Sequence, residues 1–140
     1  MCLCHRGPIY LLNVDSDAVP LVLPNREPLY ACTARFGSMG KLVTGGDDKY
    51  VRIWDVSSAT CVRSLLHQKK VACVEIDSNT KTVLFADRFG EVYGVALDDQ
   101  EAAPVLVLGH LSPISHLRLT PSGSELLTAD REGHVRNRSN

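Results

Sequence analysis

Apolar and β-branched residues occur along this chain in short runs, separated by turn-forming clusters such as Asp47–Lys49 and Ser122-Gly123. Apolar and polar positions alternate within Val71–Ile76 and Ile114–Leu119. Such alternation places successive side chains on opposite faces of a strand. No stretch has the sustained 3.6-residue apolar period of an amphipathic helix. The pattern predicts an all-β protein with strands at Leu29–Phe36, Lys41–Thr44, Tyr50–Trp54, Cys61–Leu66, Val71–Ile76, Thr82–Ala86, Glu91–Val95, Pro104–Leu108, Ile114–Leu119 and Glu125–Thr128.

The strands belong to a repeated unit. A shift of 43 positions places His67–Val92 on His110–Val135 without a gap, and Ala86–Arg88 then coincides with Ala129–Arg131. A weaker copy upstream places Val51 on Val92 with a shift of 41. A period of about 40 to 45 residues is typical of four-stranded propeller blades.

The period divides the chain into four parts. We expect residues 1–28 to hold a linker and the remnant of a preceding blade, whose last strand is Ile9–Asp15. Residues 29–66 and 67–109 each form a repeat, and residues 110–140 form an incomplete one. Closed propellers need about 4 to 8 blades. The sequence therefore predicts an open fragment of a longer propeller, with about three four-stranded blades.

Composition narrows the class of protein. The 140 residues are 44% hydrophobic, enough to form a core, which excludes a disordered chain. Fifteen Lys and Arg oppose sixteen Asp and Glu, so the chain lacks the basic field of a stand-alone nucleic-acid binder. No apolar run reaches the roughly 18 to 20 residues that a membrane-spanning helix needs. We expect a soluble protein that has no membrane partner.

The cysteines are odd in number and unevenly spaced, which favours a reducing, intracellular compartment over a disulfide framework. Cys2, Cys4 and His5 lie close together, but a zinc site needs about four ligands in two separated pairs, and no second pair follows. Cys32 and Cys73 lie within apolar runs and are expected in the core. We therefore expect no metal.

Catalytic residue types are present without a catalytic pattern. Ser112, His110, His116 and Asp130 are the types found in hydrolytic triads, but no Gly-x-Ser-x-Gly elbow occurs. No phosphate-binding loop follows a strand and opens a helix. We therefore expect no enzyme and no cofactor.

One unit resembles a known repeat closely. Thr44–Asp55 resembles the end of a WD40 repeat, and Gly109-His110 resembles its opening Gly-His pair. In that family a turn Asp, a His and a Trp form a hydrogen-bond network that stiffens the blade. The resemblance gives these structural roles to Asp48, His110 and Trp54, with Asp55 closing the motif. It implies a WD40-type β-propeller.

The other units depart from the WD40 pattern. In the second repeat, Phe89 stands where the turn Asp would be, and Val95 stands where the Trp would be. In the third repeat, Glu132 occupies the turn position.

The chain is also similar to one particular WD-repeat family, the non-catalytic subunit of tRNA (guanine-N7-)-methyltransferase. The similarity covers residues 66–136, and more loosely 29–65. It is carried by residues 82–93, 108–112, 119–123 and 127–132. The resemblance implies a subunit that binds and stabilises a separate catalytic subunit in a heterodimer. That partner binds S-adenosylmethionine and forms 7-methylguanosine in tRNA, which this chain would meet only through the complex, mainly in the nucleus.

The resemblance places the partner contact at Asp130, Arg131, Glu132 and Arg136, where Glu132 replaces an Asp of the family. Arg136 is implied to meet a carboxylate of the catalytic subunit, whereas Gly133 replaces an acidic residue and puts a second charged contact in doubt. From the residues alone, the favoured interpretation of Arg131 and Arg136 is that they are solvated surface charges. A WD40 scaffold of another complex, such as a ubiquitin-ligase adaptor or a chromatin reader, is the alternative function.

Overall fold

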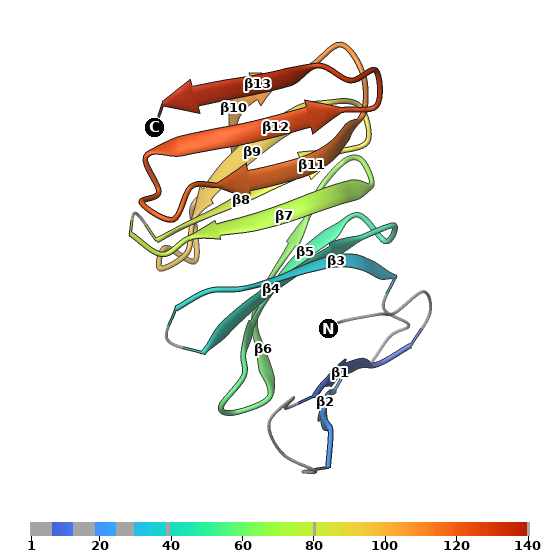
Figure 1. Cartoon of the computed structure of the whole chain (residues 1–140). Coiled ribbons are helices and arrows are strands. Elements are labelled where there is room, and N and C mark those ends of the chain that lie inside the picture. Colours follow the sequence, from blue (N-terminus) through green and yellow to red (C-terminus); the bar gives the residue numbers. More distant parts are fainter. Residues whose placement is uncertain (1–6, 13–18, 25–29, 39, 80, 140) are drawn as a thin grey trace.

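A computed structural model of the chain describes residues 7–12, 19–24, 30–38, 40–79 and 81–139, and in this part it contains strands and no helix. The strands form four antiparallel sheets, which Figure 1 shows stacked one after another. The small sheet pairs β1 (Ile9–Leu11) with β2 (Leu21–Leu23). No helix in the described part is long and apolar enough to cross a membrane.

The three larger sheets are meanders in which each strand pairs with the next along the chain. The first blade contains β3 (Ala31–Phe36), β4 (Lys41–Gly46), β5 (Tyr50–Asp55) and β6 (Thr60–Leu66). The second blade contains β7 (Val71–Asp77), β8 (Thr82–Asp87), β9 (Glu91–Ala96) and β10 (Val105–Gly109). The third blade contains β11 (Ile114–Leu119), β12 (Glu125–Asp130) and β13 (Val135–Ser139). The sheets form an open stack, not a closed ring (Figure 1).

The pairing register repeats from blade to blade. In each blade the first two strands pair at their ends, as Ala31–Gly46, Val71–Asp87 and Ile114–Asp130, and an irregularity of register follows at once. The turns 47–49, 88–90 and 131–133 therefore occupy equivalent places, as the sequence shifts of 41 and 43 predict. This register defines which residues of the three blades correspond.

Apolar side chains fill the space between neighbouring sheets. Three clusters result, one at each junction. Between the small sheet and the first blade, the cluster consists of Ile9, Leu23, Ala31, Leu42 and Trp54. Between the first and second blades, it consists of Val43, Val51, Ile53, Val71, Val74, Ile76, Val83, Phe85 and Val95. Between the second and third blades, it consists of Cys73, Leu84, Ala86, Val92, Ile114, Leu117 and Leu126. Each cluster joins one sheet to the next, so the blades are held together by face-to-face burial of alternating strand residues.

The strand predicted at Ile9–Asp15 ends at Leu11. Two further strand predictions need correction. β2 was not expected, because its three residues lie between Pro20 and Pro24 and are too few to show alternation. Second, the middle strands β4, β8 and β12 run past their predicted ends to Gly46, Asp87 and Asp130, since the last residue still pairs with the first strand of the blade.

Candidate partner-binding site at the β12–β13 turn

The residues predicted to contact a partner lie on and beside the turn that joins β12 to β13. The Gly133 N–H donates to the Asp130 carbonyl at 3.3 Å, and the Asp130 N–H donates to the His134 carbonyl at 3.0 Å. Gly133 has a φ of 88°, a conformation that glycine adopts without a steric penalty. The Arg131 N–H donates to the Pro113 carbonyl at 3.0 Å, which ties the turn to the start of the blade.

Asp130 is buried beneath this turn. Its Oδ1 accepts the backbone N–H groups of Glu132 at 3.0 Å and His134 at 2.9 Å. Its Oδ2 lies 3.2 Å from Nδ1 of His110 and 3.1 Å from Nδ1 of His134. Burial raises the pKa of this carboxyl, but the hydrogen bonds from His134 and His110 outweigh it and hold the pKa well below its usual range. Asp130 thus faces the interior, where its carboxylate fixes the turn, and its predicted contact with a partner stays a prediction.

His110 connects the turn to the middle strand. Its ring is buried, with Nδ1 facing Asp130 and Nε2 lying 2.6 Å from Oγ1 of Thr128 on β12. The ring therefore bridges the loop before β11 and the end of β12. The predicted role of His110 in stiffening the blade stays a prediction, with which these two contacts are compatible.

The second blade repeats this arrangement in part. Nε2 of His67 lies 3.2 Å from Oδ2 of Asp87, and Oδ1 of Asp87 accepts the N–H groups of Phe89 and Glu91. The carboxylate that holds this turn is therefore that of Asp87. It lies two residues before Phe89, which occupies the position of the turn Asp in the WD40 pattern. In the third blade the carboxylate that holds the turn is likewise that of Asp130. Glu132 occupies the position of the turn Asp in the WD40 pattern. The sequence already signalled both, because the 43-residue shift superposes His67 on His110 and Asp87 on Asp130.

The first blade contains the Trp and the turn Asp of the WD40 hydrogen-bond network. Trp54 is fully buried, and its indole N–H donates to Oγ1 of Thr44 at 3.0 Å. Asp48 accepts the N–H of Tyr50 and forms an ion pair of 2.6 Å with Arg52.

Asp55 stabilises the turn that follows β5. Its carboxylate accepts from Nζ of Lys41 and from Ser57 and Ser58, and the bond from Lys41 is the main reason that its pKa lies below the usual range.

Arg131, Glu132 and Arg136 lie on the surface around this core. All three are exposed. Nη1 of Arg136 donates to the carbonyl of Gly109 at 2.8 Å, across the junction with the second blade. Among the described residues, none places a carboxylate within ion-pair distance of Arg131 or Arg136. The corresponding residue of the first blade, Arg52, is neutralised by Asp48. The turn thus offers two cations whose charge the described part of the chain leaves uncompensated.

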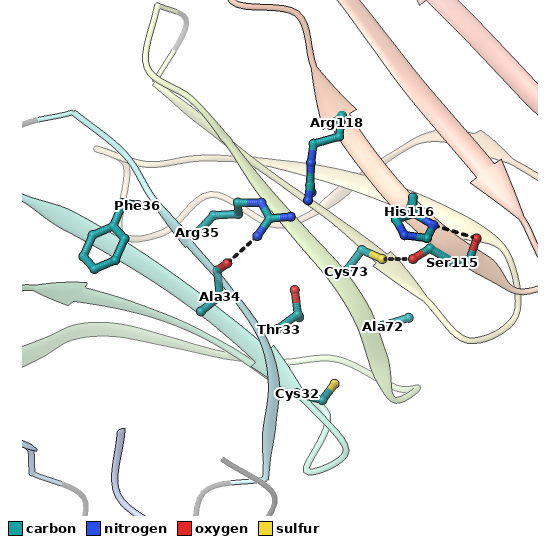
Figure 2. Close-up of a pocket in the computed structure, with 10 residues that line it drawn as sticks. All are labelled: Cys32, Thr33, Ala34, Arg35, Phe36, Ala72, Cys73, Ser115, His116 and Arg118. Atoms are coloured by element: carbon teal, nitrogen blue, oxygen red, sulfur yellow. Dashed lines mark hydrogen bonds between the residues drawn. The ribbon is translucent and has the colours of Figure 1, made fainter. Parts of the chain in front are cut away.

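A groove of about 540 Å³ lies along the first strand of each of the three larger sheets, β3, β7 and β11 (Figure 2). Arg35 and Arg118 both approach the carboxylate of Glu75, at 3.6 and 3.7 Å. The prediction of a core position for Cys32 is wrong, because this residue is exposed and lines the groove, whereas Cys73 is buried.

The groove shows no assembled reactive centre. Burial raises the pKa of the Cys73 thiol to about 11, so this thiol stays protonated near neutral pH. No group of three or more His, Cys, Asp or Glu that could hold a metal ion occurs within the part of the chain that the structure describes. Cys2, Cys4 and His5 lie outside the described residues.

The fold has clear counterparts. The family model "WD domain, G-beta repeat" matches residues 25–55. The chain superposes on a chain of the crystal structure of the Mitotic Checkpoint Complex with a TM-score of 0.83, at 20% identity over 96% of this chain and 42% of that one. The computationally designed Ika4 protein superposes with a TM-score of 0.74, at 15% identity over 95% of this chain and 79% of that one. The chain is an open stretch of WD40-type β-propeller.

Similar sequences carry one recurring description. They include the tRNA (guanine-N(7)-)-methyltransferase non-catalytic subunits wdr4 of Dictyostelium discoideum, 27% identical over 68% of this chain, and TRM82 of Debaryomyces hansenii, 26% identical over 84%. WDR4 of Bos taurus is 23% identical over 89%. This chain covers 24% to 30% of these relatives' lengths. Their names agree with the expectation that this WD40 chain is not itself an enzyme.

Proposed function

We propose that this chain is part of a non-catalytic WD-repeat subunit that binds and stabilises the catalytic subunit of a tRNA (guanine-N7-)-methyltransferase. The complex would form 7-methylguanosine in tRNA, and we expect it in the nucleus. The names of the similar proteins support this class of function. The observation that carries the proposal is Arg136, an exposed guanidinium for which the described residues supply no carboxylate.

The first blade shows what such an arginine binds. Arg52, the counterpart of Arg136, meets Asp48 at 2.6 Å. In the third blade the bond from Nη1 to Gly109 holds one edge of the Arg136 guanidinium and leaves further N–H donors for a ligand. A guanidinium can bind a carboxylate through two parallel hydrogen bonds, so an acidic side chain of the catalytic subunit fits this position.

The neighbouring charges fit a role in orienting the partner. Arg131 and Glu132 present opposite signs on an exposed turn, which favours correct encounter and association rate more than affinity. Asp130 contributes by fixing the turn from below.

The test is the affinity of this chain for the tRNA (guanine-N7-)-methyltransferase catalytic subunit of the same organism, measured by calorimetry. Arg136→Leu should weaken binding by about 1 to 3 kcal/mol, the range for a charge-assisted hydrogen bond, and Arg136→Lys should weaken it less. Arg118→Leu is the matched control, because Arg118 is also exposed on the third blade but borders the groove along β3, β7 and β11. Circular dichroism should show all three variants folded.

Two results would count against the proposal. If Arg136→Leu binds the catalytic subunit as tightly as the unmodified chain, the contact is wrongly placed. If the unmodified chain does not bind that subunit while it co-purifies with a ligase or chromatin complex, the alternative WD40 scaffold function replaces the proposed one.

A further inference from the structure

Two apolar side chains project into solvent at the junction of the second and third blades. Leu111, in the loop before β11, is 98% exposed, and Phe89, in the turn between β8 and β9, is 67% exposed. The structure describes the blades on both sides of this junction, so the two residues lie between blades and not at an end of the stack (Figure 1). We call Leu111 and Phe89 the apolar pair.

The repeat does not require apolar residues at these two positions. The shift of 43 places Leu111 on Gln68, which is also exposed. Phe89 corresponds to Asp48 in the first blade and to Glu132 in the third. Neither member of the apolar pair belongs to the core cluster of this junction. Apolar surface stabilises a protein when it is removed from water, so the side chain of Leu111 adds almost nothing to the packing of the blades.

The turn that carries Phe89 packs against the loop that carries Leu111. The Gly90 carbonyl accepts the N–H of His110 at 2.7 Å. A Cβ at Gly90 would lie only 2.5 Å from the carbonyl oxygen of Ser112. Phe89 and Leu111 are the chain neighbours of these contacting residues, so their side chains leave the backbone at adjacent places. Together they make an exposed apolar patch, a feature that marks contact sites on proteins.

The same loop lies between the two arginines of the proposed partner contact. Nη1 of Arg136 donates to the carbonyl of Gly109, at the start of the loop, at 2.8 Å. The N–H of Arg131 donates to the carbonyl of Pro113, at the end of the loop, at 3.0 Å. Leu111 is the residue midway between these two contacts. A partner that reaches both arginines therefore also reaches Leu111.

Charged contacts at the rim do not by themselves make a stable interface. Specific interfaces bury about 800 Å² on each partner, and their affinity is concentrated in a few well-packed anchors that a polar rim surrounds. Arg131 and Arg136 suit such a rim. On the other side of the apolar pair, Nζ of Lys69 lies 4.7 Å from the centroid of the Phe89 ring. The apolar pair is thus bordered by cations on both sides.

We propose that Leu111 and Phe89 are apolar anchors with which this chain binds the catalytic subunit, and that Arg131 and Arg136 border this contact. The inference rests on the proposed function and extends its contact surface from the β12–β13 turn to the second blade. The matching surface of the partner is apolar at its centre and acidic at its border, because the described residues supply no carboxylate to either arginine.

The first test is the affinity for the tRNA (guanine-N7-)-methyltransferase catalytic subunit of the same organism, measured by calorimetry. Leu111→Gln and Phe89→Gln should each weaken binding about tenfold or more, because each loses apolar surface that the contact removes from water. Val62→Gln is the matched control, since Val62 is an exposed apolar residue on β6 of the first blade, and it should leave the affinity unchanged. The melting temperature of Leu111→Gln should equal that of the unmodified chain, because this side chain is almost fully exposed.

A photo-cross-linker tests direct contact. p-Benzoylphenylalanine at position 111 should form a covalent adduct with the catalytic subunit under near-ultraviolet light, whereas the same group at position 62 should not. A change that merely disturbed the loop would give no such adduct.

The outcomes separate this inference from the proposed function. Suppose that the unmodified chain binds the catalytic subunit and that Arg136→Leu weakens the binding. If the folded Leu111→Gln and Phe89→Gln variants then bind normally and position 111 gives no adduct, this inference alone is overturned. An adduct that joins two copies of this chain would overturn it as well. If the unmodified chain does not bind the catalytic subunit, the proposed function fails and this inference fails with it.

Discussion

Single buried polar side chains organise each blade. Asp130 and Asp87 each accept two backbone N–H groups of a turn and face a histidine from the loop before the blade. In the first blade the buried polar pair is Trp54 and Thr44. A buried polar group that loses its partner costs the full penalty of desolvation, so each of these contacts affects folding.

Replacing Asp130 by Asn should lower the melting temperature at neutral pH. The folded-state pKa of Asp130 is lowered, so its ionised form contributes stability above the unfolded value of about 3.9, and this contribution is lost as pH falls. The difference in melting temperature between the two proteins should therefore shrink below about pH 4. Melting followed by circular dichroism across pH measures this. Asp98→Asn is the control, since Asp98 is exposed and pairs only with Lys81 among the described residues; an equal effect there would contradict the prediction.

Replacing Trp54 by Ala should destabilise the chain by about 3 to 5 kcal/mol, the usual cost of removing a large buried aromatic side chain. Trp54→Phe keeps most of the buried surface but removes the N–H that Thr44 accepts, so it should cost nearer 1 kcal/mol. Urea unfolding of the two variants gives both values. Equal losses would show that the hydrogen bond, and not packing, dominates at this site.

The strands and the correspondence of the turns are the part of the fold that the sequence predicts. Alternation and the 43-residue shift predict the meanders and the correspondence of the turns, because both depend on local pattern. The role of Asp87 and Asp130 as the turn carboxylates was not predicted, because it depends on contact between loops. In the first blade, Gly46 occupies the position that corresponds to Asp87 and Asp130, and a side chain there would overlap the backbone of Tyr30. The Asp of this turn is Asp48, two residues later, which pairs with Arg52.

Partner contact is less predictable for the same reason. The sequence places Asp130 beside Arg131 and Glu132, but only the fold shows that its side chain turns inward while the other two face solvent.

Two corresponding glycines in the turns should respond differently to substitution. Gly90 and Gly133 both have positive φ, so alanine at either should cost about 1 to 2 kcal/mol in strain. At Gly90 a Cβ would also lie 2.5 Å and 2.7 Å from the carbonyl oxygens of Ser112 and His110, whereas at Gly133 it would meet nothing within 4 Å. Gly90→Ala should therefore destabilise the chain more than Gly133→Ala in urea unfolding. The reverse order would contradict the assigned packing of the turns.

Across the whole molecule, the second blade is the one most fully enclosed, since a blade covers each of its faces. The buried guanidinium of Arg63 on β6 adds a polar link by donating to the carbonyls of Ala96 and Ala102 in the second blade. On the surface, Asp47 pairs with both Lys70 and Arg88 across the same junction. Stability should therefore decrease from the centre of the stack toward its ends.

Hydrogen exchange measured residue by residue tests this gradient. The amides of β7 and β8 should exchange most slowly, because their hydrogen bonds lie within the sheet that is buried on both faces. Amides of β1 and β2 should exchange fastest among the strands, since this sheet has two strands and covers one blade only. Slowest exchange in the third blade would contradict the gradient.

The burial of Trp54 gives the stack an internal optical reporter. It is the single tryptophan of the sequence, and it lies at the junction of the small sheet and the first blade. Indole emission therefore follows the loss of that one junction, while far-ultraviolet circular dichroism follows all the strands. If the two signals change together during denaturation, the blades unfold as one cooperative unit. If the emission shifts first, the stack unravels from its amino-terminal end.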